Sequence, residues 1–136
     1  MNSEYAAYRV SLSESHQAIG DVLYSAIASG LTEATFKIWH RHPVWFLNGN
    51  PIVGFSSEKK GLRLMFWSGS DFDEPDLNVK GGKFKDTSIF YNSPEEVDAP
   101  ALMRWLEKGR RIQWDYKNIV TRKGVLVRIS DSPSTD

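Results

Sequence analysis

The dipeptide Asn48-Gly49 lies between two apolar runs, and no other feature constrains the fold of this sequence as strongly. Asn-Gly is the pair that two-residue hairpin turns prefer, because both turn positions need a positive φ angle. The run before the dipeptide spans Val44 to Leu47, and the run after it spans Pro51 to Ser57. The central part of the chain is therefore predicted to contain an antiparallel β-hairpin.

Further strands are predicted on both sides of this hairpin. Thr35 to Trp39 alternates polar and apolar side chains, which places Phe36 and Ile38 on one face. Thr87 to Tyr91 is a short fifth strand. The strand Leu62 to Trp67 alternates between one face with Leu62, Leu64 and Phe66 and another with Arg63, Met65 and Trp67. Because the turns are short, the first four strands are expected to form an antiparallel meander.

Helices are predicted at both ends of the sheet. Residues 11–30 start with the capping box Ser11-x-x-Glu14, continue with one apolar stripe, and have Gly30 placed to end the helix. A second helix starts after Asp98 and runs to about Arg122. The fold class is therefore α+β, with an antiparallel sheet of about five strands and the N- and C-terminal helices on one face. We expect a single domain over residues 1–129 and a disordered tail over 130–136.

Charge and cysteine content exclude several function classes. The 136 residues include 17 basic and 17 acidic side chains, and this balance argues against a general polyanion-binding protein. Binding of nucleic acid stays an alternative only through the basic C-terminal helix, where Arg104, Lys108 and Arg111 lie near tryptophans. The chain has no cysteine, which excludes disulfides, thiolate metal sites and cysteine nucleophiles.

The remaining sequence signals favour a non-enzymatic protein of the cytoplasm. The N-terminus lacks the basic and apolar segments of a signal peptide. No apolar run reaches the ~20 residues that span a bilayer, so no membrane partner is expected. No Gly-x-Ser-x-Gly or His-Glu-x-x-His motif is present, and no nucleophile is paired with a base.

Tryptophan is the compositional oddity of the chain, with five residues, three of them in the middle third. If the strands are regular, Trp39 and Trp67 point away from Phe36 and Leu64, and periodicity does not decide which face meets the helices. The leading hypothesis is a module that binds a small molecule or a partner peptide between the tryptophan-bearing sheet and the loop 68–86. Its predicted ligand-binding residues are Trp39, His40, His42, Trp45, Trp67 and Lys83.

A metal carrier is the alternative hypothesis. His40 and His42 are two residues apart, so a regular strand places both on one face, and a nearby carboxylate would complete a metal site. The loop around Asp71 offers oxygen ligands for hard cations, although its spacing does not match a calcium loop. The predicted ligands are His40, His42, Asp71, Asp73 and Glu74. Outside this alternative, no cofactor is expected.

The order of several motifs resembles the YdhG-like family over about residues 15 to 120. The motifs are Lys37-x-Trp39 leading to Pro43, an aromatic strand, a glycine turn, the strand Leu62–Trp67, Leu77, Gly81-Gly82-Lys83 and a closing helix. The resemblance implies an α-β-α arrangement with an antiparallel sheet backed by two helices. Some members are described as frataxin-like iron chaperones, which implies iron as the alternative cofactor. Frataxin-type iron binding relies on an acidic first helix, whereas Glu14 and Asp21 are the only carboxylates of this helix here.

Overall fold

The computed structural model describes residues 1–129, so the tail predicted for 130–136 lies outside the described residues. Six strands form one sheet in the order β1-β2-β3-β4-β6-β5, and all neighbouring strands are antiparallel. Their bounds are β1 (Thr35–Trp39), β2 (His42–Leu47), β3 (Asn50–Glu58), β4 (Gly61–Phe66), β5 (Val79–Lys80) and β6 (Thr87–Tyr91). The predicted meander of the first four strands is confirmed.

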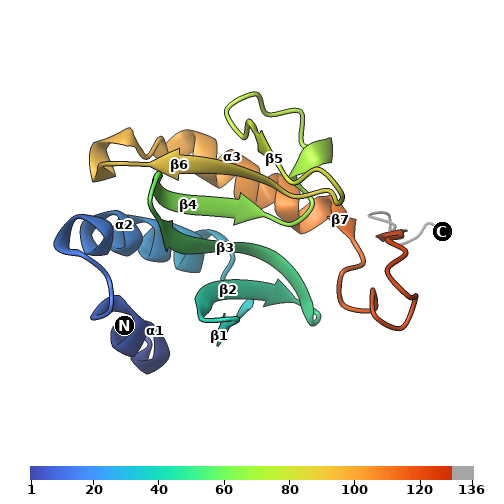
Figure 1. Cartoon of the computed structure of the whole chain (residues 1–136), viewed down its shortest axis with the longest axis horizontal. Coiled ribbons are helices and arrows are strands. Elements are labelled where there is room, and N and C mark those ends of the chain that lie inside the picture. The colour runs from blue at the N-terminus through green and yellow to red at the C-terminus, as the bar shows by residue number, and fades with distance from the viewer. Residues whose placement is uncertain (130–136) are drawn as a thin grey trace.

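Two helices, α2 (Glu14–Gly30) and α3 (Ala99–Arg111), pack on the same face of this sheet and lie behind it in Figure 1. No described element covers the opposite face, which is called the open face below. The α+β class and the one-sided packing of helices are confirmed. Within residues 1–129, no helix is both long and apolar enough to span a bilayer. Short elements complete the chain, namely the 3-10 turns Gly69–Asp71 and Pro94–Glu96 and a small sheet of β7 (Gln113–Trp114) and β8 (Arg128–Ile129).

The core lies between the sheet and the two helices. Leu62, Leu64 and Phe66 of β4 are all 0% exposed, so the face predicted from their alternation is the covered one. Burial of each such side chain stabilises the fold by about 1.5–3 kcal/mol before entropy is counted. The helices contribute Ile19, Leu23 and Ile27 from α2 and Leu102, Trp105 and Leu106 from α3.

The N-terminal part of the chain differs from the prediction. A short helix, α1 (Ser3–Arg9), precedes α2 and packs through Tyr5, whose ring stacks on Tyr24 at a centroid distance of 4.2 Å. The helix α2 starts after Ser13, whose hydroxyl accepts a hydrogen bond from the amide of His16 (3.2 Å), so the predicted cap at Ser11 is wrong. Ser11 instead donates its hydroxyl hydrogen bond to the carbonyl of Tyr8.

Gly30 has a different role from the predicted helix cap. It is the last residue of α2, as predicted, but it does not adopt a positive φ, and the C-cap is Leu31. A Cβ atom at this position would lie 2.6 Å from Cδ1 of Leu106. The glycine therefore lets α2 approach α3 closely.

The C-terminal helix is shorter than predicted, because α3 ends at Arg111 rather than near Arg122. The buried side chain of Asn50 explains this end. Its amide donates to the carbonyl of Trp114 (3.0 Å), and its oxygen accepts from the amides of Tyr116 and Lys117 (3.0 Å each). These hydrogen bonds hold the backbone after α3 in a turn. Asn50 lies 64 to 67 residues away in the sequence, so helical periodicity contains no signal of this contact.

Candidate functional site

The three tryptophans of the middle third lie on opposite faces of the sheet. Trp45 points into the covered core, where it is 2% exposed and packs against Phe36 at a centroid distance of 4.8 Å. Trp39 and Trp67 lie together on the open face, with centroids 6.2 Å apart. The prediction that Trp45 shares a ligand-binding surface with them is wrong. Because β2 is apolar at every position after His42, its sequence contains no alternation that would assign a face.

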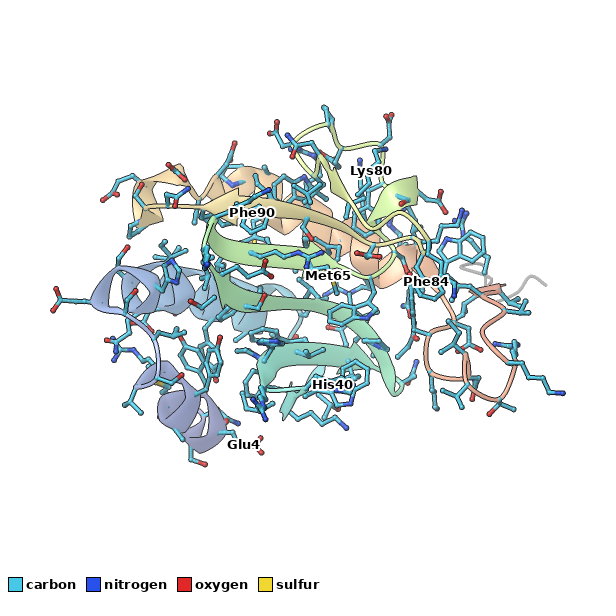
Figure 2. All side chains as sticks on the ribbon, viewed as in Figure 1. Glu4, His40, Met65, Lys80, Phe84 and Phe90 are labelled. Atoms are coloured by element: carbon cyan, nitrogen blue, oxygen red, sulfur yellow. The ribbon has the colours of Figure 1, made fainter. Side chains whose placement is uncertain are left out.

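Trp39 and Trp67 border a hollow of about 170 Å³, called the open-face hollow below. Ligand pockets for drug-sized molecules measure roughly 300–1,000 Å³, so this one has room for a headgroup or a single side chain. Figure 2 shows Met65 near the middle of the sheet and His40 at the turn between β1 and β2. The hollow is lined by Trp39, His40, His42, Val44, Gly54, Phe55, Ser56, Glu58, Arg63, Met65 and Trp67.

Gly54 forms the floor of the open-face hollow. It lies in the middle of β3, opposite Val44 on one side and Met65 on the other. A Cβ atom there would lie 3.4 Å from the ring of Trp67 and 2.6 Å from the carbonyl oxygen of Pro43. A larger residue would therefore both fill the hollow and push β2 away. Glycine weakens a strand interior and often marks the close approach of a ligand or backbone, a signal that the sequence analysis missed.

The turn His40-Arg41 forms one rim of the hollow. It is a two-residue loop, since Trp39 pairs with His42, and both loop residues have positive φ (50° and 71°). This region of backbone space costs residues with a Cβ atom roughly 1–2 kcal/mol each. The strained turn brings the imidazole of His40 to a centroid distance of 4.3 Å from the ring of Trp39.

The polar end of the hollow carries one carboxylate, Glu58, and one guanidinium, Arg63, while a second carboxylate, Asp86, lies outside the lining. Arg63 donates from Nε to the hydroxyl of Ser88 (2.8 Å), and its guanidinium lies 3.6 Å from the carboxylates of both Glu58 and Asp86. Burial holds the pKa of His42 below its ordinary value, because it disfavours the charged imidazolium more than Glu58 favours it. At neutral pH the two carboxylates therefore face one guanidinium and a neutral imidazole.

The structure brings four of the six predicted ligand-binding residues to this hollow. Trp39, His40, His42 and Trp67 line it, whereas Trp45 lies in the core. Lys83 does not line it either. It lies between β5 and β6, with its ammonium 5.2 Å from the ring centroid of Phe84, and β5 is at the opposite edge of the sheet from β1.

The predicted metal ligands do not come together. His40 and His42 lie at the end of the β1–β2 hairpin, whereas the carboxylate of Asp71 accepts a hydrogen bond from the indole of Trp114 (2.7 Å). Asp73 has a positive φ of 57° in the loop after the 3-10 turn Gly69–Asp71. In the part of the chain that the structure describes, no three His, Asp or Glu side chains converge as a metal site.

Glu74 is bound by cationic and indole donors of α3 rather than free for a metal. Arg104 donates to both carboxylate oxygens (2.8 Å each), Lys108 to one (2.6 Å), and the indole of Trp105 to the other (2.8 Å). The hydrogen bonds from Arg104, followed by those from Lys108 and Trp105, lower the pKa of Glu74 to about 2. This cluster, in which the carboxylate of Glu74 is buried and Arg104 is half exposed, fastens the loop 68–86 to α3.

The basic residues on which the alternative of nucleic-acid binding depends are paired with carboxylates. Arg104 and Lys108 are both paired with Glu74, and Arg111 lies 3.5 Å from Glu107 on its own helix. Their charges are therefore offset by carboxylates within the described fold, which weakens any attraction for phosphate.

A solved structure with the same architecture supports the fold predicted from the motif order. It is the crystal structure of YdhG, a DUF1801-family protein from Bacillus subtilis, with a TM-score of 0.60 and 18% sequence identity over 88% of this chain and 91% of that chain. No family profile matches the sequence, and no curated protein matches it. The predicted YdhG-like resemblance is confirmed at the level of the fold, which by itself does not assign a function.

Proposed function

We propose that this YdhG-like fold serves as a non-enzymatic binding module whose ligand occupies the open-face hollow. The observation that supports this most directly is the pair of partly exposed rings, Trp39 and Trp67, over the mid-strand Gly54 on the face that no helix covers. Large rings that converge with a few polar groups are the usual composition of a ligand site.

The local cost of building the hollow supports the same proposal. Gly54 weakens β3, and the turn His40-Arg41 adopts a conformation that residues with a Cβ atom disfavour. Strained and weakened positions of this kind cluster at ligand sites, where the surrounding structure compensates for them. The stable core on the other face, centred on Leu64 and Phe66, supplies that compensation.

The dimensions of the hollow limit its ligand. With about 170 Å³, it accommodates the headgroup of a small molecule or one side chain of a peptide. The apolar walls, which include Val44 and Met65, would bury the body of that group, while Glu58, Arg63 and His42 offer polar contacts at one end.

A fragment screen by saturation-transfer NMR tests the proposal on three proteins. The wild type is compared with Trp67→Ala, which removes one wall, and with Phe90→Ala, which removes a ring of the same face outside the hollow. We expect small aromatic and aliphatic fragments that bind the wild type and Phe90→Ala and that Trp67→Ala binds at least tenfold more weakly. Near-ultraviolet circular dichroism checks that both variants fold.

Two outcomes would contradict the proposal. The first is a screen in which no fragment binds the wild type. The second is a set of fragments that bind Trp67→Ala as tightly as the wild type, because their site would then lie elsewhere on the molecule.

A further inference from the structure

We infer that the open-face hollow recognises an alkylated ammonium group, held against the rings of Trp39 and Trp67 with the carboxylate of Glu58 as its counter-charge. This inference rests on the proposed binding function and specifies the class of ligand.

The two indole rings offer the strongest reason for a cation. Trp39 and Trp67 are tilted by 39° to each other at a centroid distance of 6.2 Å, so they form a corner rather than a parallel slot. A corner suits a rounded group such as trimethylammonium better than a flat ring. The face of tryptophan attracts a cation more strongly than that of any other side chain, and partial removal from water increases this attraction.

The carboxylate of Glu58 adds a charge that is only partly used within the protein. Its Oε2 accepts a hydrogen bond from the hydroxyl of Ser56 (3.0 Å) and lies 3.6 Å from Arg63. No hydrogen bond to its Oε1 occurs within residues 1–129, and the side chain is 40% exposed. Glu58 can therefore face a cation in the hollow without losing its present contacts.

The single guanidinium of the hollow does not turn it into an anion site. Arg63 is bracketed by Glu58 and Asp86 and donates to Ser88. Because Glu58 and Asp86 already pair with Arg63 and His42 carries no charge at neutral pH, an anion would find no unpaired guanidinium here and would meet the negative faces of two indoles.

The apolar part of the wall favours an alkylated over a primary ammonium group. A primary ammonium has three N–H donors that need partners once they leave water. The walls made by Val44, Gly54 and Met65 contain no side-chain oxygen or nitrogen. A quaternary ammonium has no N–H donor, so these walls leave none of its groups unsatisfied.

Choline and its uncharged isostere, 3,3-dimethylbutan-1-ol, form the decisive pair of probes, since they share one shape and differ in charge. Each is titrated into the full chain, with tryptophan fluorescence and one-dimensional NMR as readouts. We expect choline to bind about tenfold more tightly than the isostere, the effect of a partly desolvated cation–π contact. A peptide with trimethyllysine is the third probe, and tighter binding than choline would identify a protein side chain as the source of the group.

Matched variants separate charge from shape. Glu58→Gln should weaken choline about threefold or more and leave the isostere unchanged, whereas Glu95→Gln, a change at an exposed position outside the hollow, should alter neither. Equal affinity of choline and the isostere for the wild type would overturn the cation inference and leave the proposed binding function intact. Binding of screened fragments without binding of choline would do the same, while a wild type that binds no probe at all would overturn both.

Discussion

The two faces of the sheet have been built under different constraints. On the covered face, Leu64 and Phe66 are completely buried, and even the carboxylate of Glu74 has four hydrogen-bond donors at its oxygens. On the open face, Gly54 interrupts a strand and two tryptophan rings remain partly exposed to solvent. One face is therefore optimised for stability, and the other retains features that reduce stability, as binding sites commonly do.

The two hairpin turns at the ends of β2 repeat this difference on a smaller scale. Both are two-residue loops with two positive φ angles, 50° and 71° at His40-Arg41 and 52° and 81° at Asn48-Gly49. Asn-Gly is the preferred sequence for this geometry, whereas His-Arg is not. The unfavourable pair lies at the rim of the open-face hollow, and the favourable pair lies away from it.

The largest expected effect on stability comes from shortening a side chain of β4 that points into the covered core. Shortening its neighbour on the open face is the comparison. Phe66→Ala leaves a cavity in the covered core and should lower the free energy of unfolding by about 3–5 kcal/mol. Met65→Ala, on the open face, should lower it by only about 1 kcal/mol, because its side chain is already partly exposed. Urea denaturation of both variants measures the difference, and equal losses would contradict the distinction between the faces.

The next largest effect on stability is expected from removing the buried negative charge of Glu74. Glu74→Gln leaves Arg104 and Lys108 without their counter-charge and should lower the free energy of unfolding by about 2–3 kcal/mol. Glu95→Gln, at an exposed position, is the control and should change it by less than about 0.5 kcal/mol.

The pH dependence of stability gives an independent measure of the same cluster. The pKa of Glu74 falls from an ordinary 4.5 to about 2 on folding, so its stabilisation is complete above pH 4.5 and is lost as the pH falls towards 2. Wild-type stability should therefore decline over this window by about 1–2 kcal/mol more than that of Glu74→Gln, because solvent around the half-exposed Arg104 screens the pair. Parallel pH profiles of the two proteins would show that Glu74 does not carry this stabilisation.

A smaller effect is expected from exchanging the two turn sequences. Asn-Gly in place of His40-Arg41 should raise the free energy of unfolding by about 1–2 kcal/mol, since glycine removes the strain at position 41 and asparagine tolerates the left-handed region at position 40. His-Arg in place of Asn48-Gly49 should lower it by at least as much, because a Cβ atom at Gly49 would also lie 3.0 Å from the side chain of Lys117. Denaturation curves of both exchanges test this, and a first exchange without any gain would mean that the turn at the rim is not strained.

The sequence predicted much of the covered face and less of the open face. Alternation in Leu62–Phe66 assigned the strand, its buried side and its neighbours correctly, since burial on one face leaves a period of two. The short helix α1 was missed although its N-cap, Asn2, is a local signal, because seven residues are too few to show a repeated apolar stripe. The end of α3 was missed because Asn50 sets it from a distant strand.

The composition of the open-face hollow was predictable only in part. His40, His42 and the two tryptophans were identified from residue type, but Glu58 and Arg63 come together only through the register of β3 and β4. The isolated Gly54 in an apolar strand was the one local signal of the floor that the sequence contains.

The indole N–H signals of the five tryptophans in a two-dimensional ¹H–¹⁵N spectrum test the central claim most directly. The spectrum is recorded during titration with choline and with each fragment that binds the wild type. The signals of Trp39 and Trp67 are expected to shift, while those of Trp45 and Trp105, which are 2% and 1% exposed on the covered face, should stay in place. Shifts confined to Trp114 or to the covered pair, with Trp39 and Trp67 unchanged, would contradict the assignment of the open face as the binding side of this molecule.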